Sequence, residues 1–166
     1  MSIGIDFHIN RLIVVFNSKL WVGKNKYFVG RVFRIIKDSK VIPSKSIDGT
    51  NEYQIALKND NYDAQCFFDV MPQETIISGV HHADINLCFM VNLASLYPTL
   101  NRLDATENVH VDIERLLRRS NIEFTELTRG ITSFDNYDMS GFIISDMSPH
   151  YLFRYTIKIN YNNSNC

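Results

Sequence analysis

The sequence is poor in the residues and motifs on which many catalytic and cofactor sites depend. Its 166 residues include 7 glycines, 4 prolines, 3 cysteines and 1 tryptophan. It contains neither a glycine-rich phosphate-binding loop nor the Gly-x-Ser-x-Gly turn that presents a nucleophilic serine. The cysteines, Cys66, Cys88 and Cys166, are far apart and form no Cys-x-x-Cys pair, which is typical of reduced thiols in a cytoplasmic protein.

An excess of charge of one sign is also lacking. The chain has 17 Lys and Arg against 18 Asp and Glu, a net charge of -1, so no general field attracts nucleic acid or an anionic membrane. The apolar segment from Ile9 to Trp21 is interrupted by polar residues and lacks a signal-peptide cleavage site. We therefore expect a soluble protein that is no enzyme, holds no cofactor or metal, and contacts no membrane.

The size and composition predict one domain. A chain of this length with 45% apolar residues can bury about 70% of its unfolded surface in a single core. We expect residues 1–166 to form that domain. The segment from Lys37 to Asn51, rich in turn-forming residues, is predicted to be a long protruding loop, and residues 162–166 a flexible tail.

The strongest pattern in the chain runs from Ala83 to Leu93, where apolar residues alternate as in a long strand. The residues expected to face the core are Ile85, Leu87, Phe89, Val91 and Leu93. The residues expected on the other face, where water or a partner would meet them, are Asp84, Asn86, Cys88, Met90 and Asn92. A second alternating strand is predicted from Tyr151 to Tyr161.

Two segments have helical periodicity. The first runs from Asp6 to Trp21 and is expected to end at Gly23. The second is expected to begin at Asp104, with Glu107 completing a capping box, or at a Thr106 cap, and to end near Ser120 and Asn121. Its apolar residues and its terminal arginines are Val109, Ile113, Leu116 and Leu117, and Arg115, Arg118 and Arg119.

The remaining segments complete an α+β pattern. We predict a strand from Tyr27 to Ile36 with a bulge at Gly30. A hairpin is predicted from two runs around the polar turn 58–61, and Phe124 to Thr128 is predicted as a short strand. The runs of that hairpin are Glu52 to Leu57 and Tyr62 to Met71, with Pro72 ending the second or placing it at an edge, and 73–78 as a further short strand before a turn at Gly79. The predicted fold is a mostly antiparallel sheet with two helices packed on one face and long loops, among them 129–148 with a small strand at 142–144.

Metal and thiol chemistry have weak candidates. His81 and His82 are adjacent, so on a strand they point in opposite directions and cannot readily share one ion. Cys88 has no local base or helix start that would activate it as a nucleophile. Three aspartates resemble a calcium loop, but their spacing does not fit an EF-hand, and a solvated turn is favoured; they are Asp135, Asp138 and Asp146.

Nucleic-acid binding is a further alternative. Four arginines could form a basic stripe and three aromatic residues could stack on bases, although a strand that buries one face needs the same aromatic spacing. These residues are Arg115, Arg118, Arg119 and Arg129, with Tyr151, Phe153 and Tyr155. The net charge and the lack of RRM or OB-fold signatures disfavour this interpretation.

The order of elements resembles that of tail terminator and head-tail connector proteins of tailed bacteriophages. The resemblance rests on an N-terminal helix, the strand pattern at 83–87, Leu96-Tyr97-Pro98, the helical pattern at 109–116, and the closing segment 146–159, and it spans about residues 5 to 161. It implies a structural virion protein, assembled in the host bacterial cytoplasm, that forms a ring at the neck or tail top.

The resemblance also implies the partners. They are copies of the chain in a ring, neighbouring portal, connector or tail proteins, and DNA in a channel. Heterologous rings need protruding segments that reach the next copy, and the loops and the polar strand face offer them. The residues predicted at such an interface are Lys37, Lys40, Ile42, Lys45, Ile47, Asp84, Asn86, Arg129, Asp135 and Tyr137.

A second hypothesis is a small cytosolic binding module, such as a bacterial immunity or inhibitor protein that masks a toxin. It is motivated by the near-neutral charge, the lack of a catalytic constellation and the many Tyr and Asn residues suited to interfaces. A third is an enzyme that uses Cys88 or His82.

Overall fold

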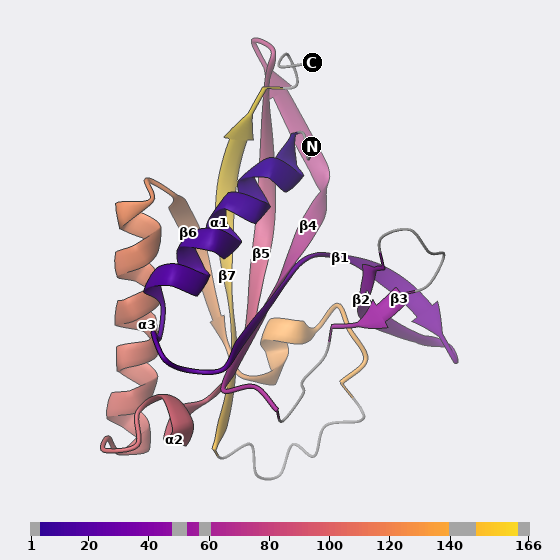
Figure 1. Ribbon diagram of the computed structural model, residues 1–166. Helices are drawn as coiled ribbons and strands as arrows, with labels where there is room; N and C mark the ends of the chain where they lie inside the picture. Colours follow the sequence, from indigo (N-terminus) through magenta and orange to yellow (C-terminus); the bar gives the residue numbers. More distant parts are fainter. Residues whose placement is uncertain (1–3, 48–52, 57–60, 140–148, 163–166) are drawn as a thin grey trace.

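The computed structural model of the chain describes residues 4–47, 53–56, 61–139 and 149–162. Seven strands form one mixed sheet in the order β3-β2-β1-β4-β5-β7-β6. Figure 1 shows that α1 crosses one face of the sheet while α3 lies beside β6. The elements are α1 (Ile5–Lys19), β1 (Lys26–Lys37), β2 (Lys40–Ser46), β3 (Tyr53–Ile55), β4 (Ala64–Ile77), β5 (Val80–Asn92), α2 (Leu93–Leu96), α3 (Arg102–Arg119), β6 (Glu123–Arg129), the 3-10 helix η1 (Ile131–Phe134) and β7 (His150–Tyr161).

The two alternating segments form neighbouring strands at the centre of the fold. β5 and β7 pair in antiparallel register over their whole length, from His81 opposite Tyr161 to Asn92 opposite His150. Phe89 and Phe153 lie opposite each other and their rings stack at 5.0 Å between centroids. Such cross-strand aromatic pairs stabilise a sheet beyond their burial alone. Both predicted strands are therefore confirmed.

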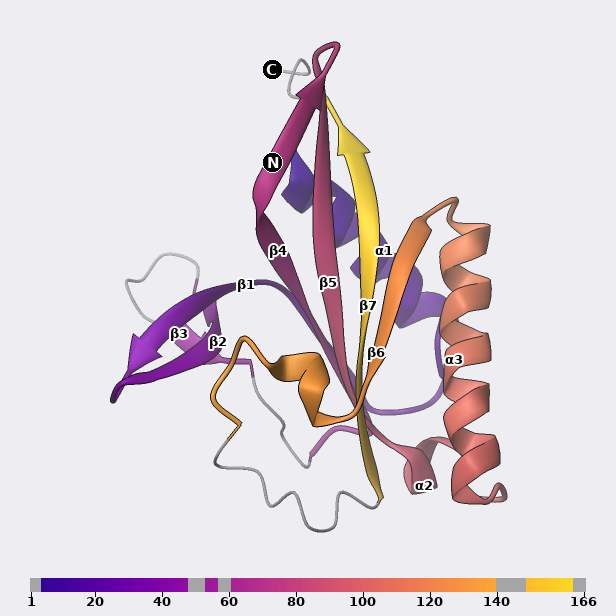
Figure 2. The ribbon, with the colours of Figure 1, turned by 180° about the vertical axis from the view of Figure 1, so that it is seen from behind.

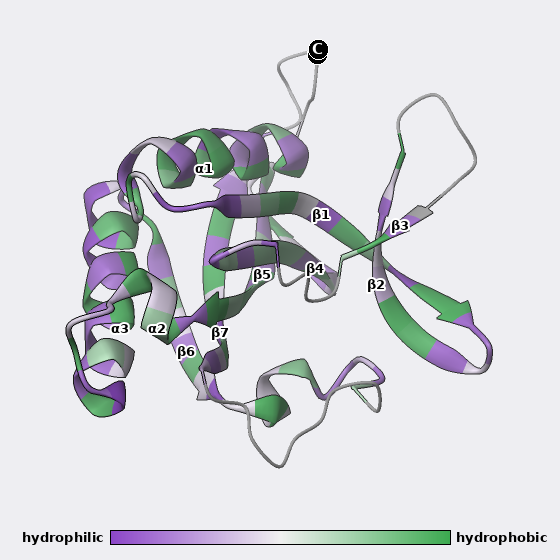
Figure 3. Ribbon diagram, turned by 60° about the horizontal axis from the view of Figure 1, so that its bottom comes forward, coloured by the Kyte–Doolittle hydropathy of each residue, from purple (hydrophilic) through white to green (hydrophobic). Residues whose placement is uncertain are grey.

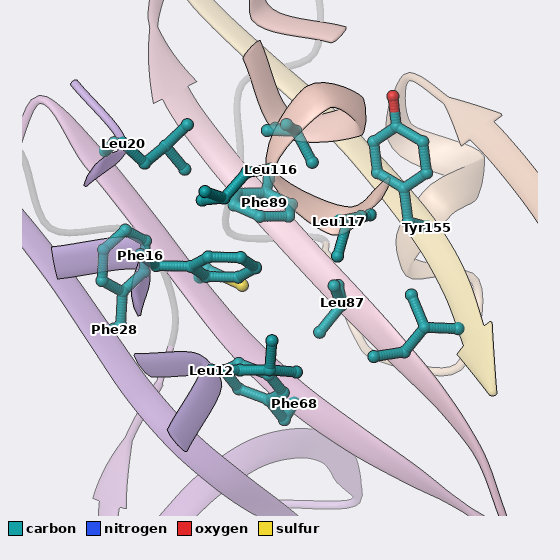
Figure 4. Packing of buried hydrophobic residues seen from close by; sticks show 14 of the residues in the cluster. Leu12, Phe16, Leu20, Phe28, Phe68, Leu87, Phe89, Leu116, Leu117 and Tyr155 are labelled. Carbon is teal, nitrogen blue, oxygen red and sulfur yellow. The ribbon is translucent and has the colours of Figure 1, made fainter. Parts of the chain in front are cut away.

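The face of the sheet that carries Phe89 is covered by α1 and α3, and we call it the helix face. The main apolar core lies there (Figure 4). Phe16 of α1 contacts both Phe28 and Phe89, and Ile113 of α3 is fully buried in the same cluster. A helix buries such a stripe only when its apolar residues recur at intervals of three and four, which is the pattern of both segments.

Two details of the predicted helices are wrong. α1 ends at Lys19, four residues before Gly23, because Leu20 is extended and buried in the core. α3 begins earlier than predicted, since its N-cap is Asn101, whose side-chain oxygen accepts a hydrogen bond from the backbone N–H of Asp104 at 3.0 Å. Asp104 is therefore a first-turn acid of the helix, where the dipole favours it. The end of α3, with Ser120 as C-cap, agrees with the prediction.

The opposite face of the sheet, which we call the second face, is buried at Asn86, Cys88 and Met90, which were predicted to meet water, whereas Asp84 is exposed as predicted. Cys88 and Met90 are 1% and 4% exposed, and they pack with Phe67, Phe134 and Tyr137 in a second apolar cluster. The cover is the segment 131–139 with η1, visible in front of the sheet in Figure 2. A short apolar segment far away in the sequence thus hides residues whose own pattern looked amphipathic.

The predicted loop from Lys37 to Asn51 is wrong, since residues 40–46 form β2. β2 pairs with β1 through a tight turn at Asp38 and Ser39, both at positive φ, as a two-residue hairpin turn of that type requires. Pro43 lies within this strand, although proline in the middle of a sheet removes a hydrogen-bond donor. Residues 48–51 of the predicted loop lie outside the described residues.

The predicted hairpin around 58–61 is also wrong. β3 pairs with β2, whereas β4 lies between β1 and β5. β1 and β4 run parallel and make the sheet mixed, while the other pairings are antiparallel. β4 also continues through Pro72 to Ile77, because the proline sits in an irregular stretch between Val70 and Glu74. The turn residues 58–60 lie outside the described residues.

Three smaller predictions are confirmed. Gly30 sits at a register shift of β1 with φ +91, which confirms the bulge, and Gly79 forms the turn into β5. β6 confirms the predicted strand at Phe124 to Thr128. The fold is thus α+β, but α2 and η1 were not predicted, and the small strand at 142–144 and the tail 163–166 lie outside the described residues. No helix in the described part of the chain is long and apolar enough to cross a membrane.

Candidate interaction surfaces

The most prominent surface feature is a three-stranded arm, which we define as the second half of β1 (33–37), β2 and β3. The first half of β1, up to Val32, pairs with β4, and from Phe33 onward β1 pairs only with β2. Figure 3 shows the arm projecting from the side of the sheet away from α1 and α3. β1 thus belongs to the body in its first half and to the arm in its second half.

One side of the arm carries an apolar surface that none of the described helices covers. Phe33 lies opposite Ser44, and Ser44 lies opposite Ile55, so Phe33 and Ile55 flank a small buried serine on one side. They are 46% and 47% exposed. Ile35 and Ile42 form the next row on this side and are half-buried. We call the four residues Phe33, Ile35, Ile42 and Ile55 the arm face.

Two lysines lie at one end of the arm face. Lys37 of β1 and Lys40 of β2 are exposed there, and Lys40 lies 3.9 Å from Asp138, whereas Lys45 follows Ser44 on β2 and is exposed on the opposite side of the arm. An apolar centre within a charged rim is the usual anatomy of a protein-protein interface.

An ion pair with one buried partner links the arm to the body. Arg34, one residue into the arm, donates a 2.9 Å hydrogen bond to Asp69 of β4, whose side chain is 4% exposed. The guanidinium also lies 5.9 Å from the ring centre of Tyr137. The hydrogen bond to Asp69 raises the pKa of Arg34, and burial raises the pKa of Tyr137. The arm therefore leaves the body at a fixed angle.

Backbone contacts add to this anchor. The N–H of Asp138 donates to the carbonyl of Val41 at 2.8 Å, and the N–H of Ala56 donates to the carbonyl of Pro43 at 2.8 Å. Val41 packs against the cluster on the second face. The segment that covers the second face thus also contacts the arm, at Val41 of β2.

A groove of about 730 Å³ lies between α1, α3 and the end of β7. Its apolar lining includes Leu12, Leu116 and Ile159, and Trp21 closes one part of it. Four cationic residues of the two helices also line it: Arg11, Lys19, Arg115 and Arg119. Lys158 of β7 borders the groove, but it alternates with the core residues Ile157 and Ile159, so its side chain points to the second face. Asp112 is the one carboxylate in this lining, and it already binds the hydroxyl of Tyr97 at 2.5 Å.

A buried polar chain joins α3 to β7 under the helix face. The Tyr155 hydroxyl donates to Glu114 at 3.2 Å, so it accepts from Nδ1–H of His110 at 2.8 Å. Nε2 of His110 then accepts from Tyr151 at 2.9 Å. Burial lowers the pKa of His110 to about 4, so the ring is neutral at pH 7. Every ring nitrogen is satisfied inside the fold, which marks this histidine as structural.

The structure gathers half of the predicted interface residues on or beside the arm. Those on the arm or directly after β2 are Lys37, Lys40, Ile42, Lys45 and Ile47. Asp84, Arg129 and Asp135 are exposed elsewhere, the last two in ion pairs with Glu107 and Arg154. Asn86 and Tyr137 are 3% and 7% exposed, so neither offers a surface to another chain.

Three residues of the arm face were not predicted from the sequence to lie at an interface: Phe33, Ile35 and Ile55. The signal was present in part, because 32–36 reads Val-Phe-Arg-Ile-Ile and places apolar residues on both sides of a strand. A strand with two apolar sides is either covered on both or meets another chain on one. Which of these applies depends on where the pairing of β1 with β4 ends, and that pairing joins residues far apart in the sequence.

The weaker chemical candidates do not assemble into a site. Among the described residues no three His, Cys, Asp or Glu side chains converge as metal ligands. Cys88 is buried, and burial raises the pKa of its thiol, which is the reverse of an activated nucleophile. His82 lies 2.7 Å from the side chain of Asn160. Asp146 of the candidate calcium loop lies outside the described residues.

No protein-family model matches the sequence, and no curated protein matches it at a significant level. Its function is therefore inferred from the arm, its anchor and the surfaces around them.

Proposed function

We propose that this protein is a structural virion protein that forms a ring at the head-tail junction or tail top of a tailed bacteriophage. In this proposal the arm of each copy docks on the next copy and no catalysis is involved. The arm face is the observation that carries it, because an apolar surface on a projecting three-stranded element is incomplete until another chain covers it.

The position of the arm favours a heterologous contact. The arm lies at one end of the sheet order and β6 at the other. A surface at one end of a molecule that binds a different surface at the other end generates a ring when the rotation closes. A symmetric dimer needs no such separation of the two surfaces.

The anchor favours tight assembly. Binding costs less free energy when the contacting segment is already ordered. Arg34, Asp69 and the contact between Asp138 and Val41 hold the arm in place within one chain. A rigid arm also sets the angle between neighbouring copies, and that angle determines how many copies close a ring.

The assignment to a phage neck or tail top rests on the order of the elements. The N-terminal helix, the long strand that contains residues 83–87, the helix at 102–119 and the closing strand follow one another in the order on which the resemblance rests. Neighbouring portal, connector or tail proteins are then the expected further partners, with DNA passing through the ring.

The assembly of purified protein tests this proposal. We expect a single closed oligomer by sedimentation velocity and rings by negative-stain electron microscopy. Phe33→Asp places a carboxylate in the arm face and should leave a folded monomer. Ile77→Asp is the matched control, because Ile77 is 62% exposed but lies at the tip of the β4-β5 hairpin, away from the arm.

The outcomes separate the two main hypotheses. A ring that survives Ile77→Asp but not Phe33→Asp supports assembly through the arm, and detection of the protein in purified phage particles supports the virion role. A protein that stays monomeric at all concentrations and binds one unrelated bacterial protein at one-to-one stoichiometry would instead establish the immunity or inhibitor hypothesis.

A further inference from the structure

We propose that the groove between α1, α3 and β7 binds a nucleoside phosphate, with its phosphates held by the cationic side chains and its base against the apolar lining. The proposal does not depend on ring formation, because it rests on a different surface. A free nucleotide and a nucleotide within a single strand both carry this chemical group, and the experiment below distinguishes them.

Three cations of the groove have no carboxylate partner. Arg11, Lys19 and Arg119 are exposed and make no ion pair with any residue that the structure describes. Arg115 lies 3.9 Å from Asp112, which also accepts a hydrogen bond from the Tyr97 hydroxyl. Most other arginines are matched, as in the pairs of Arg34 with Asp69 and of Arg129 with Glu107, although Arg102 also makes no ion pair with a described residue. The groove thus collects several unmatched positive charges in one hollow despite a net charge of -1.

The fold itself explains only part of this charge. Lys19 and Arg119 lie at the C-terminal ends of α1 and α3, where the helix dipole favours cations by a few tenths of a kcal/mol. Arg11 lies in the middle of α1, so the dipole does not account for it, whereas Lys158 lies opposite Asp84 and Glu123 in the sheet. Neighbouring like charges repel each other, and an anionic ligand removes that cost.

The size and lining favour a nucleotide over a bare anion. A volume of about 730 Å³ is in the range of small-molecule sites, which combine apolar walls with a few polar groups. Arginine forks match phosphate oxygens in pairs, and three of the cations are arginines. Val15 and Ile122, which are half-buried in the same lining, offer the apolar surface that a base needs, while Leu12, Leu116 and Ile159 are themselves buried.

Binding of ATP to the purified full-length protein, in whichever assembly it adopts, tests the proposal. Isothermal titration at low ionic strength should give one site per chain. Trp21, the single tryptophan, lines the groove, so its indole N–H resonance should shift on binding. Tripolyphosphate should bind several-fold more weakly than ATP, because it lacks the base, and added salt should weaken both.

Charge reversal locates the site. Arg119→Glu should raise the dissociation constant at least tenfold. Arg102→Glu is the matched control: it reverses an arginine at the other end of α3, 17 residues and about 25 Å away, and should change the constant less than twofold. Circular dichroism confirms that both variants fold.

Four outcomes would overturn the proposal: no ATP binding at millimolar concentration, binding without a shift of the Trp21 resonance, equal loss in both variants, or a glutamate-rich peptide binding as tightly as ATP. The source of the ligand follows from chain length. Tighter binding of a ten-nucleotide single strand than of ATP, with a steeper salt dependence, identifies a nucleic-acid strand. The reverse order identifies a free nucleotide.

Discussion

The two faces of the sheet are buried by different means. On the helix face, α1 and α3 lay large aromatic and aliphatic side chains over Phe68, Leu87 and Phe89. On the second face, the segment 131–139 covers a smaller cluster, and polar side chains hold the rest. Those polar contacts are Arg34 with Asp69, Thr156 with Asn86, and Arg154 with Asp135 and the carbonyl of Ser133.

The difference separates two roles. The helix face contributes most of the apolar burial and therefore most of the stability. The second face contributes less burial, but its ion pair and its backbone contacts fix the arm. We expect changes on the helix face to unfold the whole domain and changes on the second face to alter the arm first.

The largest effect tests the helix face. Phe89→Ala removes a fully buried ring that contacts Phe16, Trp21 and Phe153, and should lower the free energy of unfolding by about 3–5 kcal/mol. Phe134→Ala should cost less, about 2 kcal/mol, because the segment that carries it can collapse into the space. Urea unfolding measures both. Equal losses would show that the two faces are packed equally rigidly.

Removing the charge of Asp69 tests the second face. Asp69→Asn leaves Arg34 unpaired, and the cost should be about 2–3 kcal/mol, below that of a fully buried pair because the arginine side chain is 36% exposed. Amide hydrogen exchange of residues 34–46 should accelerate more than that of β5. Asp38→Asn, in the turn of the arm, is the control and should change neither quantity. If β5 and the arm accelerate together, the ion pair supports the domain as a whole.

His110 is a buried polar residue on the helix face, and it makes the free energy of unfolding depend on pH. The unfolded chain binds a proton at this residue near pH 6.5, whereas the folded chain does so only near pH 4. Between these values the unfolded state binds more protons, so the free energy of unfolding should fall by about 2 kcal/mol as the pH drops from 6.5 to 4.5. His110→Gln should flatten this slope. The same slope in both proteins would refute the assignment.

The smallest effect concerns the N-terminus of α3. Asn101→Ala removes the side-chain oxygen that accepts from the N–H of Asp104 and should cost about 1 kcal/mol. Asp104→Ala should cost only a few tenths, because Asp104 acts through the helix dipole and not as the cap. Thermal unfolding of the two variants distinguishes them, and the opposite order would restore the cap predicted from the sequence.

Local periodicity was enough to predict the helix face. The intervals of three and four in α1 and α3 and the alternation in β5 and β7 depend on neighbours in the sequence, so the presence and type of each element were predicted, although the end of α1 and the start of α3 were not. The bulge at Gly30 and the turn at Gly79 follow from the conformational freedom of glycine.

The second face and the arm could not be predicted in this way. Cys88 and Met90 are buried by residues more than 40 positions away, and the parallel pairing of β1 with β4 leaves no local trace. β2 contains a proline and four polar residues, Lys40, Ser44, Lys45 and Ser46, so it has the composition of a loop. Ile42 was predicted at an interface because its segment resembled a protruding loop. Phe33 was not predicted, because its exposure depends on these long-range contacts.

The division of β1 between body and arm has a mechanical consequence. A pull on the arm along β1 loads the hydrogen bonds between residues 26–32 and β4 in shear, so that they share the force and do not open one after another. In the proposed ring, a copy held by its neighbour through the arm would thus resist being pulled out, because the force falls on β1, a strand near the middle of its own sheet.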